Sequence, residues 1–136
     1  RLRCRMKMYE SEAKLFKVMT HPARLAILDM LRYGEECVCH MEAYLGFRQA
    51  YISQQLMVLR EAGLVEDRRE GWNIFYRVVK PQIYAVIDAM DALIGKKHAF
   101  PAEKARQTHP ACPCPKCHAA EEPSGLELSK KSPVEN

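Results

Sequence analysis

The fold is decided by one stretch of the chain, residues 46–79, which reads GFRQAYISQQLMVLREAGLVEDRREGWNIFYRVV. Its first half predicts a helix over about Gln49–Ala62, because Ile52, Leu56 and Leu59 recur at the spacing of one helix face. A glycine directly after this run is the residue expected just past a helix end. The polar residues between the apolar ones leave the opposite face of this helix available to a partner.

The second half of the same stretch predicts a β-hairpin. Leu64–Arg69 and Trp72–Val79 flank a turn at Glu70-Gly71, and the second run is rich in Trp, Ile, Phe, Tyr and Val. A hairpin that directly follows a pair of helices joined by a short connection is typical of a winged helix-turn-helix, in which the hairpin is the wing.

The remaining helices complete this arrangement. Apolar spacing and breaking residues predict helices over Tyr9–Met19, from Pro22 up to Gly34, from about Cys37 to Leu45, and from Pro81 onward. The fold class is therefore mainly α with a small β-hairpin, in the order α-α-α-α-β-β-α. The apolar face of the last helix has no role on a DNA surface, and we expect it to form a homodimer together with the first helix.

Composition supports one globular domain with extensions. Of 136 residues, 48% are hydrophobic and 28% are charged, which is ordinary for a folded soluble protein. No apolar run is long enough to cross a membrane, and no Gly-rich phosphate loop indicates a nucleotide-using enzyme. We divide the chain into a basic arm (1–8), a winged-helix domain (9–99) and a flexible cysteine-containing tail (100–136) that holds most of the eight prolines.

The net charge of +4 suits a polyanion such as double-stranded DNA. The N-terminal end of a recognition helix enters the major groove, where Arg, Gln and Ser can read base edges. Arginines beside the wing turn can reach phosphates. The candidate DNA-binding residues are Arg48, Gln49, Tyr51, Ser53, Gln54 and Gln55 on the helix, and Arg68 and Arg69 on the wing.

The cysteines are the second set of candidate site residues. Nothing in the sequence indicates secretion, so we expect a reducing, cytoplasmic location in which thiols bind metal or sense oxidants. Cys37 and Cys39 form a C-x-C pair at a helix start, followed by His40. A third thiolate can come from the arm, through Cys4, or from the tail motif C-P-C-P-K-C-H, which contains Cys112, Cys114 and Cys117.

The C-x-C pair needs a special backbone to bind one ion. Residues i and i+2 lie about 200° apart around a helix, so the two sulfurs converge only at a frayed first turn. The helix N-terminus also favours the thiolate by lowering the pKa of a thiol. Three thiolates satisfy a trigonal site and four ligands a tetrahedral one, and an all-sulfur site selects soft or borderline ions.

At this point the chain resembles the ArsR/SmtB family of metal-sensing repressors over about residues 9–95. The resemblance is carried by residues 15–19, 22–28, 36–39 and 52–65, with Gly71-Trp72 and 75–77 in the wing. It implies a homodimeric, non-enzymatic repressor that leaves operator DNA when a thiophilic ion binds, without an organic cofactor. The C-V-C pair is similar to the site of the branches that sense arsenic and cadmium or lead. We favour As(III) or Sb(III) as the inducer, followed by Cd(II) or Pb(II). The chain can bring three thiolates together easily but not four, and three thiolates suit a trivalent ion.

The sequence also departs from the family pattern. The arsenic branch often has a third cysteine where this chain has Glu42, and the cadmium/lead branch uses two arm cysteines where only Cys4 is found. Two alternatives therefore stay open. One is a winged-helix regulator whose thiols form a redox switch, and the other is a metal-buffering protein that uses the cysteines of the tail.

Overall fold

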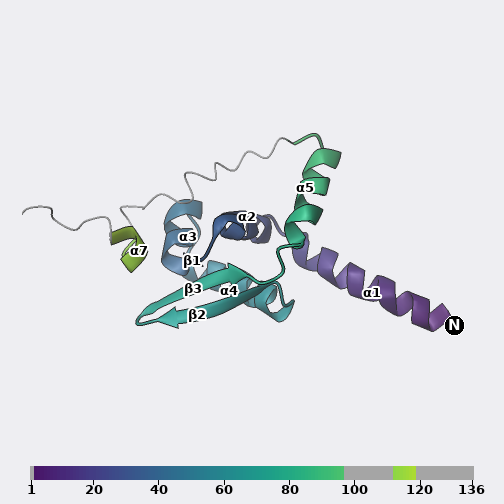
Figure 1. The fold of residues 1–136 in the computed structure, drawn as a ribbon, viewed down its shortest axis with the longest axis horizontal. Coiled ribbons are helices and arrows are strands. Elements are labelled where there is room, and N and C mark those ends of the chain that lie inside the picture. The colour runs from purple at the N-terminus through teal and green to yellow at the C-terminus, as the bar shows by residue number, and fades with distance from the viewer. Residues whose placement is uncertain (1, 97–111, 119–136) are drawn as a thin grey trace, which may run out of the picture.

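The computed structural model describes residues 2–96 and 112–118, and the expected order of helices and hairpin is confirmed (Figure 1). The elements are α1 (Leu2–Met19), α2 (Pro22–Met30), the 3-10 helix η1 (Leu31–Tyr33), β1 (Glu36–Cys37), α3 (Val38–Leu45), α4 (Gln49–Glu61), β2 (Val65–Glu70), β3 (Asn73–Val78), α5 (Ile83–Leu93) and α7 (Pro115–His118). Helices α3 and α4 form the helix-turn-helix, and β2 and β3 form the wing.

The apolar faces of α2, α3 and α4 meet in one core. Ile27 and Leu28 of α2, Met41 of α3, and Ile52 and Leu56 of α4 are fully buried. Burial of each such side chain stabilises the fold by roughly 1.5–3 kcal/mol. The predicted face of α4 is therefore the one that anchors this helix, which leaves its polar face outside.

The helix ends follow the breaking residues. Pro22 occupies the first turn of α2, and the Nδ1 atom of His21 caps that helix by accepting a hydrogen bond from the backbone N–H of Ala23 at 3.3 Å. Gly46 ends α3 with a left-handed backbone (φ 72°), where a residue with a Cβ would be strained. The tight connection that follows lets α4 begin only three residues later.

The sheet has one strand more than the hairpin that the sequence predicted. Its order is β1-β3-β2, all antiparallel, with Cys37 opposite Phe75 and Glu36 opposite Tyr76. A two-residue strand has no detectable periodicity, so this element was missed. It matters because it anchors Cys37 against the wing.

Helix α1 starts earlier than expected. We expected a basic arm over residues 1–8 and a helix from Tyr9, but α1 runs without a break from Leu2. Residues 2–8 contain neither Gly nor Pro, so nothing stops the helix from extending through them. Among the described residues, no helix is both long enough and apolar enough to span a membrane.

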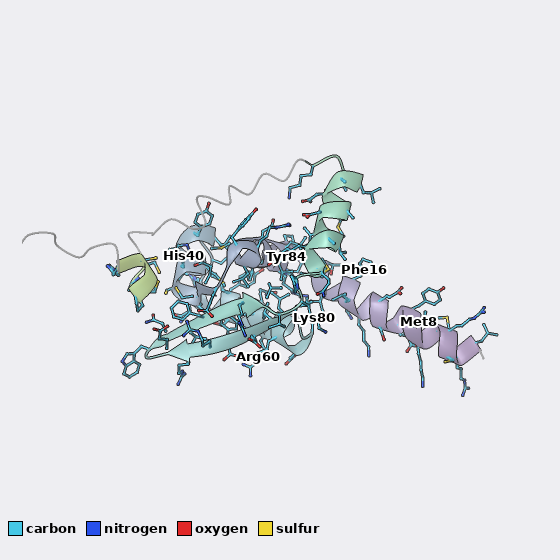
Figure 2. The ribbon with its side chains drawn as sticks, viewed as in Figure 1. Met8, Phe16, His40, Arg60, Lys80 and Tyr84 are labelled. Carbon is cyan, nitrogen blue, oxygen red and sulfur yellow. The ribbon has the colours of Figure 1, made fainter. Side chains whose placement is uncertain are left out.

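Helices α1 and α5 leave apolar side chains uncovered. Of the predicted α5 face, Ile83 and Ile87 are buried, whereas Met90 and Ile94 are exposed. Figure 1 shows α1 projecting from the rest of the protein, and Figure 2 locates Met8 and Phe16, both exposed, on this helix. Exposed apolar side chains that gather on a surface mark a site of contact with a partner.

The described part of the tail is packed and not free. The expectation of a flexible tail over 100–136 is wrong for residues 112–118, in which Cys112, Cys114 and Cys117 are buried against Cys37 and Phe75. The sequence analysis emphasised the prolines of the tail, but cysteines behave as small hydrophobic residues when buried. The other tail residues lie outside the described part of the chain.

Candidate functional site

The C-x-C pair converges because its first residue lies outside the helix. Cys37 is the N-cap of α3 and has an extended backbone (φ −85°, ψ 157°), while its Sγ accepts a hydrogen bond from the N–H of His40 at 3.2 Å. Cys39 lies in the first turn of α3, and the Sγ atoms of Cys37 and Cys39 are 2.7 Å apart. The change from strand to helix at Cys37 overcomes the 200° separation expected of a continuous helix.

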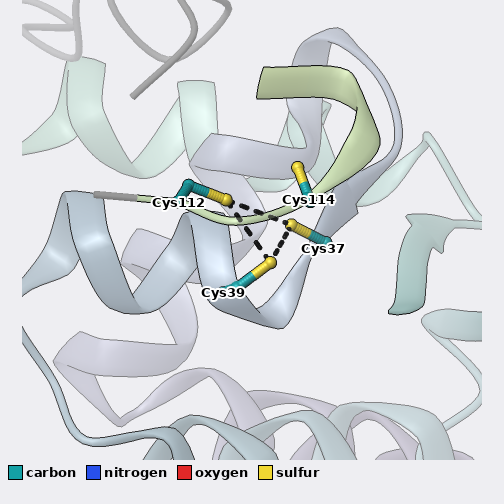
Figure 3. Close-up of side chains that lie close together, drawn as sticks. All are labelled: Cys37, Cys39, Cys112 and Cys114. Atoms are coloured by element: carbon teal, nitrogen blue, oxygen red, sulfur yellow. Dashed lines mark hydrogen bonds between the residues drawn. The ribbon is translucent and has the colours of Figure 1, made fainter. Parts of the chain in front are cut away.

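The tail supplies the further sulfurs. The Sγ of Cys112 lies 3.7 Å from that of Cys37 and 3.4 Å from that of Cys39, which closes a triangle (Figure 3). The Sγ of Cys114 lies beside this triangle, and all four sulfur atoms are within 4.8 Å of one another. Cys39 is half-buried and the other three are buried, so these four residues, which we call the sulfur cluster, are largely shielded from water.

The prolines of the tail support this arrangement. Pro115 begins α7, where its fixed φ and missing N–H suit a first helical turn. The carbonyl oxygen of Cys114 accepts hydrogen bonds from the N–H groups of Cys117 at 3.0 Å and His118 at 3.1 Å. The resulting turn points three cysteines inward and leaves Pro113 and Pro115 exposed.

Burial sets the protonation of the sulfur cluster. It raises the pKa of Cys37 and raises that of Cys112 to about 11. We expected the helix N-terminus to lower the pKa of Cys37, but the loss of hydration outweighs it. Burial also opposes ionisation of Cys114, yet hydrogen bonds from the N–H of Cys117 and from neighbouring thiols lower its pKa overall. An ion that binds here therefore has to displace protons.

The sulfur cluster fits a soft ion. In a tetrahedral site with metal–sulfur bonds of about 2.3 Å, neighbouring sulfurs are about 3.8 Å apart. The separations of Cys112 from Cys37 and Cys39 are close to this value, and the Cys37–Cys39 pair has to open by about 1 Å. Thiolates favour thiophilic ions over Mg²⁺ or Ca²⁺. The described residues can therefore hold an ion that is coordinated by three or four sulfur atoms.

Cys4 is not part of this cluster within one chain. It is exposed on α1, and Figure 1 shows the start of α1 and the α7 segment at opposite ends of the molecule. The sequence analysis named Cys4 and the tail cysteines as alternative sources of a third sulfur. In this structure the third sulfur beside Cys37 and Cys39 belongs to Cys112 of the tail. The ligand role predicted for Cys4 is untested in a single chain, and the sites proposed below do not include this residue.

The recognition helix presents most, but not all, of the predicted residues. Arg48, Gln49, Ser53 and Gln54 are exposed at the N-terminal end of α4. Gln55 is only 8% exposed, and its Oε1 accepts a hydrogen bond from the Nε of Arg24 at 2.9 Å. Gln55 therefore differs from the other predicted residues, because it lies on the flank of α4 that packs against α2, and its role in DNA binding stays a prediction.

Tyr51 is held in place by its neighbours. Its hydroxyl lies 3.3 Å from the Nε2 of His21, and its ring packs on Phe47 with ring centroids 5.2 Å apart. It is half-buried, so it both fixes the start of α4 and reaches the surface.

The two wing arginines differ. Arg68 pairs with Glu35 and Glu70, and its guanidinium lies 5.1 Å from the ring centroid of Phe75. Arg69 is exposed on the same strand. Trp72, which the list of candidate residues omitted, is fully exposed at the turn of the wing. A fully exposed tryptophan indicates a surface that contacts a partner. The sequence could have revealed it, because the neighbouring residues of the turn are not apolar and cannot bury the side chain of Trp72.

A cavity joins the cysteine pair to residues of α4 that are predicted to read DNA. It has a volume of about 140 Å³ and is lined by Cys37 and Cys39 at the start of α3, by Gln49 and Ser53 of α4, and by residues 72–74 and 76 of the wing. A shift of Cys39 therefore changes the space beside two predicted base-reading side chains.

The chain matches known proteins over this same region. The sequence profile described as "Bacterial regulatory protein, arsR family" matches residues 21–67. The biofilm growth-associated repressor of Agrobacterium fabrum is 47% identical over 81 residues, which cover 60% of this chain and 69% of that protein. The arsenic resistance transcriptional regulator ArsR1 of Pseudomonas putida is 43% identical over 68 residues, 50% of this chain and 52% of that protein.

Solved structures agree with these relatives. The transcriptional repressor BigR from Xylella fastidiosa superposes with a TM-score of 0.60 at 35% identity and covers 68% of this chain and 95% of its own. NolR from Sinorhizobium fredii superposes with a TM-score of 0.62 at 29% identity, over 68% and 93%. The relatives are regulators, so the expectation that the chain is not an enzyme is confirmed. The chain belongs to the ArsR/SmtB family of winged-helix, DNA-binding transcriptional repressors.

Proposed function

We propose that this repressor binds operator DNA in its ion-free state and leaves it when a thiophilic ion binds Cys37, Cys39 and Cys112. The observation that carries the proposal is the triangle of three sulfurs, 2.7 to 3.7 Å apart, two of which belong to residues that line the cavity reaching α4. Two sulfurs come from the start of α3 and one from the tail, so the ion ties together segments more than 70 residues apart.

The inducer is a trivalent metalloid, As(III) or Sb(III), ahead of Cd(II) or Pb(II). Three thiolates satisfy a trigonal ion, and the triangle already brings three sulfurs together, so that only the Cys37–Cys39 pair has to open. Cys114, which completes a set of four sulfurs within 4.8 Å, is the additional ligand for a divalent ion. The arsenic resistance regulator of Pseudomonas putida among the relatives supports the first choice.

The coupling to DNA runs through the cavity. Binding opens the Cys37–Cys39 pair by about 1 Å, as estimated from ideal metal–sulfur geometry. Because Cys37 is anchored by its pairing with Phe75, the displacement falls on Cys39 and the first turn of α3. That turn shares the cavity with Gln49 and Ser53. If the ion prefers the displaced conformation, operator and ion weaken each other's binding by the same factor.

The repressor acts as a homodimer. The exposed apolar residues of α1 and α5, including Phe16, Leu93 and Ile94, supply a surface that a second copy can cover. The structural relative Mb0332 from Mycobacterium bovis, at 29% identity and a TM-score of 0.58, is described as a homodimeric winged helix-turn-helix domain. Two copies place two recognition helices about one turn of DNA apart.

Fluorescence anisotropy with the DNA upstream of the gene tests this function. Under reducing conditions we expect tight binding that As(III) or Sb(III) abolishes, and that Cd(II), Pb(II) and Zn(II) weaken less. Cys37→Ser combined with Cys39→Ser should keep DNA binding and lose the response, whereas the matched control Cys4→Ser should keep both. Release of the double variant by As(III) would refute the proposed site, and metal binding without release would indicate a buffering protein instead.

A redox switch is the second candidate. Cys39 and Cys112 lie 3.4 Å apart and come from different segments, so a disulfide between them avoids the strain of an adjacent C-x-C bridge. Hydrogen peroxide would oxidise the two thiols to a disulfide and be reduced to water. Release from DNA by peroxide in the presence of a chelator, reversed by dithiothreitol, would favour this candidate over the metal sensor.

A further inference from the structure

A buried histidine and a fifth thiol lie directly beside the sulfur cluster. The Nδ1 of His40 is 3.3 Å from the Sγ of Cys117, and the Sγ of Cys112 lies within 4.8 Å of that sulfur and of a ring nitrogen of His40. Figure 2 shows His40 on α3, next to the α7 segment. Cys112 therefore belongs to two groups of potential ligands, one with the other sulfurs and one with His40 and Cys117.

The surroundings orient His40 for ligation. Its Nε2 lies 4.0 Å from a carboxylate oxygen of Glu36, and both residues are at most 3% exposed. Its ring stacks on Tyr44 with an interplanar angle of 18°. A carboxylate that accepts a hydrogen bond from one ring nitrogen is the usual way in which a protein aims the other nitrogen at a metal ion, and Glu36 has to move about 1 Å closer to form this bond. Burial of a histidine and a glutamate costs free energy of folding, and coordination of a metal ion by His40 would offset part of this cost.

The spacing suits a tetrahedral divalent ion. With bonds of about 2.0 Å to nitrogen and 2.3 Å to sulfur, the two ligand atoms are about 3.5 Å apart. The observed separation of 3.3 Å between His40 and Cys117 is close to this value. His40, Cys112 and Cys117 supply three ligands, which leaves the fourth position of the ion for a water molecule.

We propose that His40, Cys112 and Cys117 bind a second thiophilic divalent ion of the Zn²⁺ and Cd²⁺ type, with the thiolate of Cys112 bridging it to the ion in the sulfur cluster. This inference rests on the proposed function for the first ion. Five ionised sulfurs in one buried site carry a charge of −5, and a single divalent ion leaves most of it uncompensated. A second ion reduces the net charge to −1, which lowers the cost of burial.

The second ion would fasten the tail to the body. Cys117 lies in α7 and His40 in α3, so their shared ion fixes the tail in the position that gives Cys112 to the inducer site. The tail motif would then supply the third sulfur of the inducer site. The affinity of His40, Cys112 and Cys117 for a divalent ion would set the fraction of molecules in which Cys112 lies beside Cys37 and Cys39.

Cadmium stoichiometry tests this inference on the full chain. Equilibrium dialysis against Cd²⁺ under reducing conditions, followed by elemental analysis, should give two ions per chain. ¹¹³Cd NMR should give one resonance typical of sulfur-only ligation and one shifted upfield by a nitrogen ligand. Cys117→Ser and, independently, His40→Ala should each bind one ion and lose the upfield resonance, whereas Cys4→Ser should retain two of each.

The outcomes separate this inference from the proposed function. One ion per chain in the wild type, or two in both Cys117→Ser and His40→Ala, would overturn the second site. As(III) should still release Cys117→Ser from DNA, because Cys37, Cys39 and Cys112 remain, but a higher As(III) concentration should be needed because the second ion no longer holds the tail in place. If the wild type binds two Cd²⁺ ions but As(III) does not release it from DNA, the second site is supported and the proposed inducer is refuted.

Discussion

Two adjacent glutamines of α4 are expected to have opposite roles. Gln55 is nearly buried and accepts a hydrogen bond from the guanidinium of Arg24 at 2.9 Å. Gln55→Ala removes this acceptor and leaves Arg24 with its second bond, from Nη1 to the carbonyl oxygen of Val18 at 2.7 Å. Because a hydrogen bond to a charged group contributes about 1.5–3 kcal/mol, the free energy of unfolding should fall by roughly that amount.

Gln54 is the matched control on the same helix. It is exposed, so Gln54→Ala should change the free energy of unfolding by less than about 0.5 kcal/mol. If Gln54 pairs with a base, its loss should weaken operator binding by about 1–3 kcal/mol, which is roughly 5- to 150-fold. Gln55→Ala should leave the affinity of the folded protein for DNA nearly unchanged.

Urea denaturation followed by circular dichroism measures the first effect, and fluorescence anisotropy on the operator measures the second. All variants are compared at one protein concentration, because the stability of a dimer depends on it. The reasoning is refuted if Gln55→Ala unfolds like the wild type and weakens operator binding as strongly as Gln54→Ala does. Gln55 would then read DNA, and its contact with Arg24 would be broken in the complex.

Three further results are expected. Arg69→Ala should reduce the slope of log affinity against log salt concentration by about 1, whereas Arg68→Ala should reduce it less because Glu35 and Glu70 already pair with Arg68; equal slopes would contradict this. Trp72, the only tryptophan, is fully exposed on the wing, so its emission should change when operator DNA is added, and unchanged emission would exclude a wing-tip contact. The apparent affinity for Cd²⁺ should rise from pH 6.5 to pH 8.5, because burial raises the pKa of Cys112 to about 11 and binding has to expel its proton; a pH-independent affinity measured by calorimetry would argue against thiolate ligation.

The sequence by itself determined the architecture. The apolar spacing in α4, the proline and glycines at helix ends, and the β-branched and aromatic residues of the wing are local signals, and local signals are sufficient to order helices and strands along the chain. The C-x-C pair was identified in the same way, as were the exposed candidates Gln49, Ser53 and Arg69. Errors in helix bounds, such as the start of α1, arose where no breaking residue marked the end.

Only the tertiary structure decided which side chains meet. Cys112 lies 75 residues after Cys37 in the sequence, and no periodicity relates the two positions. Gln55 and Gln54 are the same residue type in one helix, yet the packing of α2 buries the first and leaves the second exposed. Likewise, β1 exists only because β3 is there to pair with it. Contacts between distant segments depend on how the elements pack in space, and for this reason the grouping of Cys112 and Cys114 with the C-x-C pair follows from the fold but not from the spacing of the cysteines.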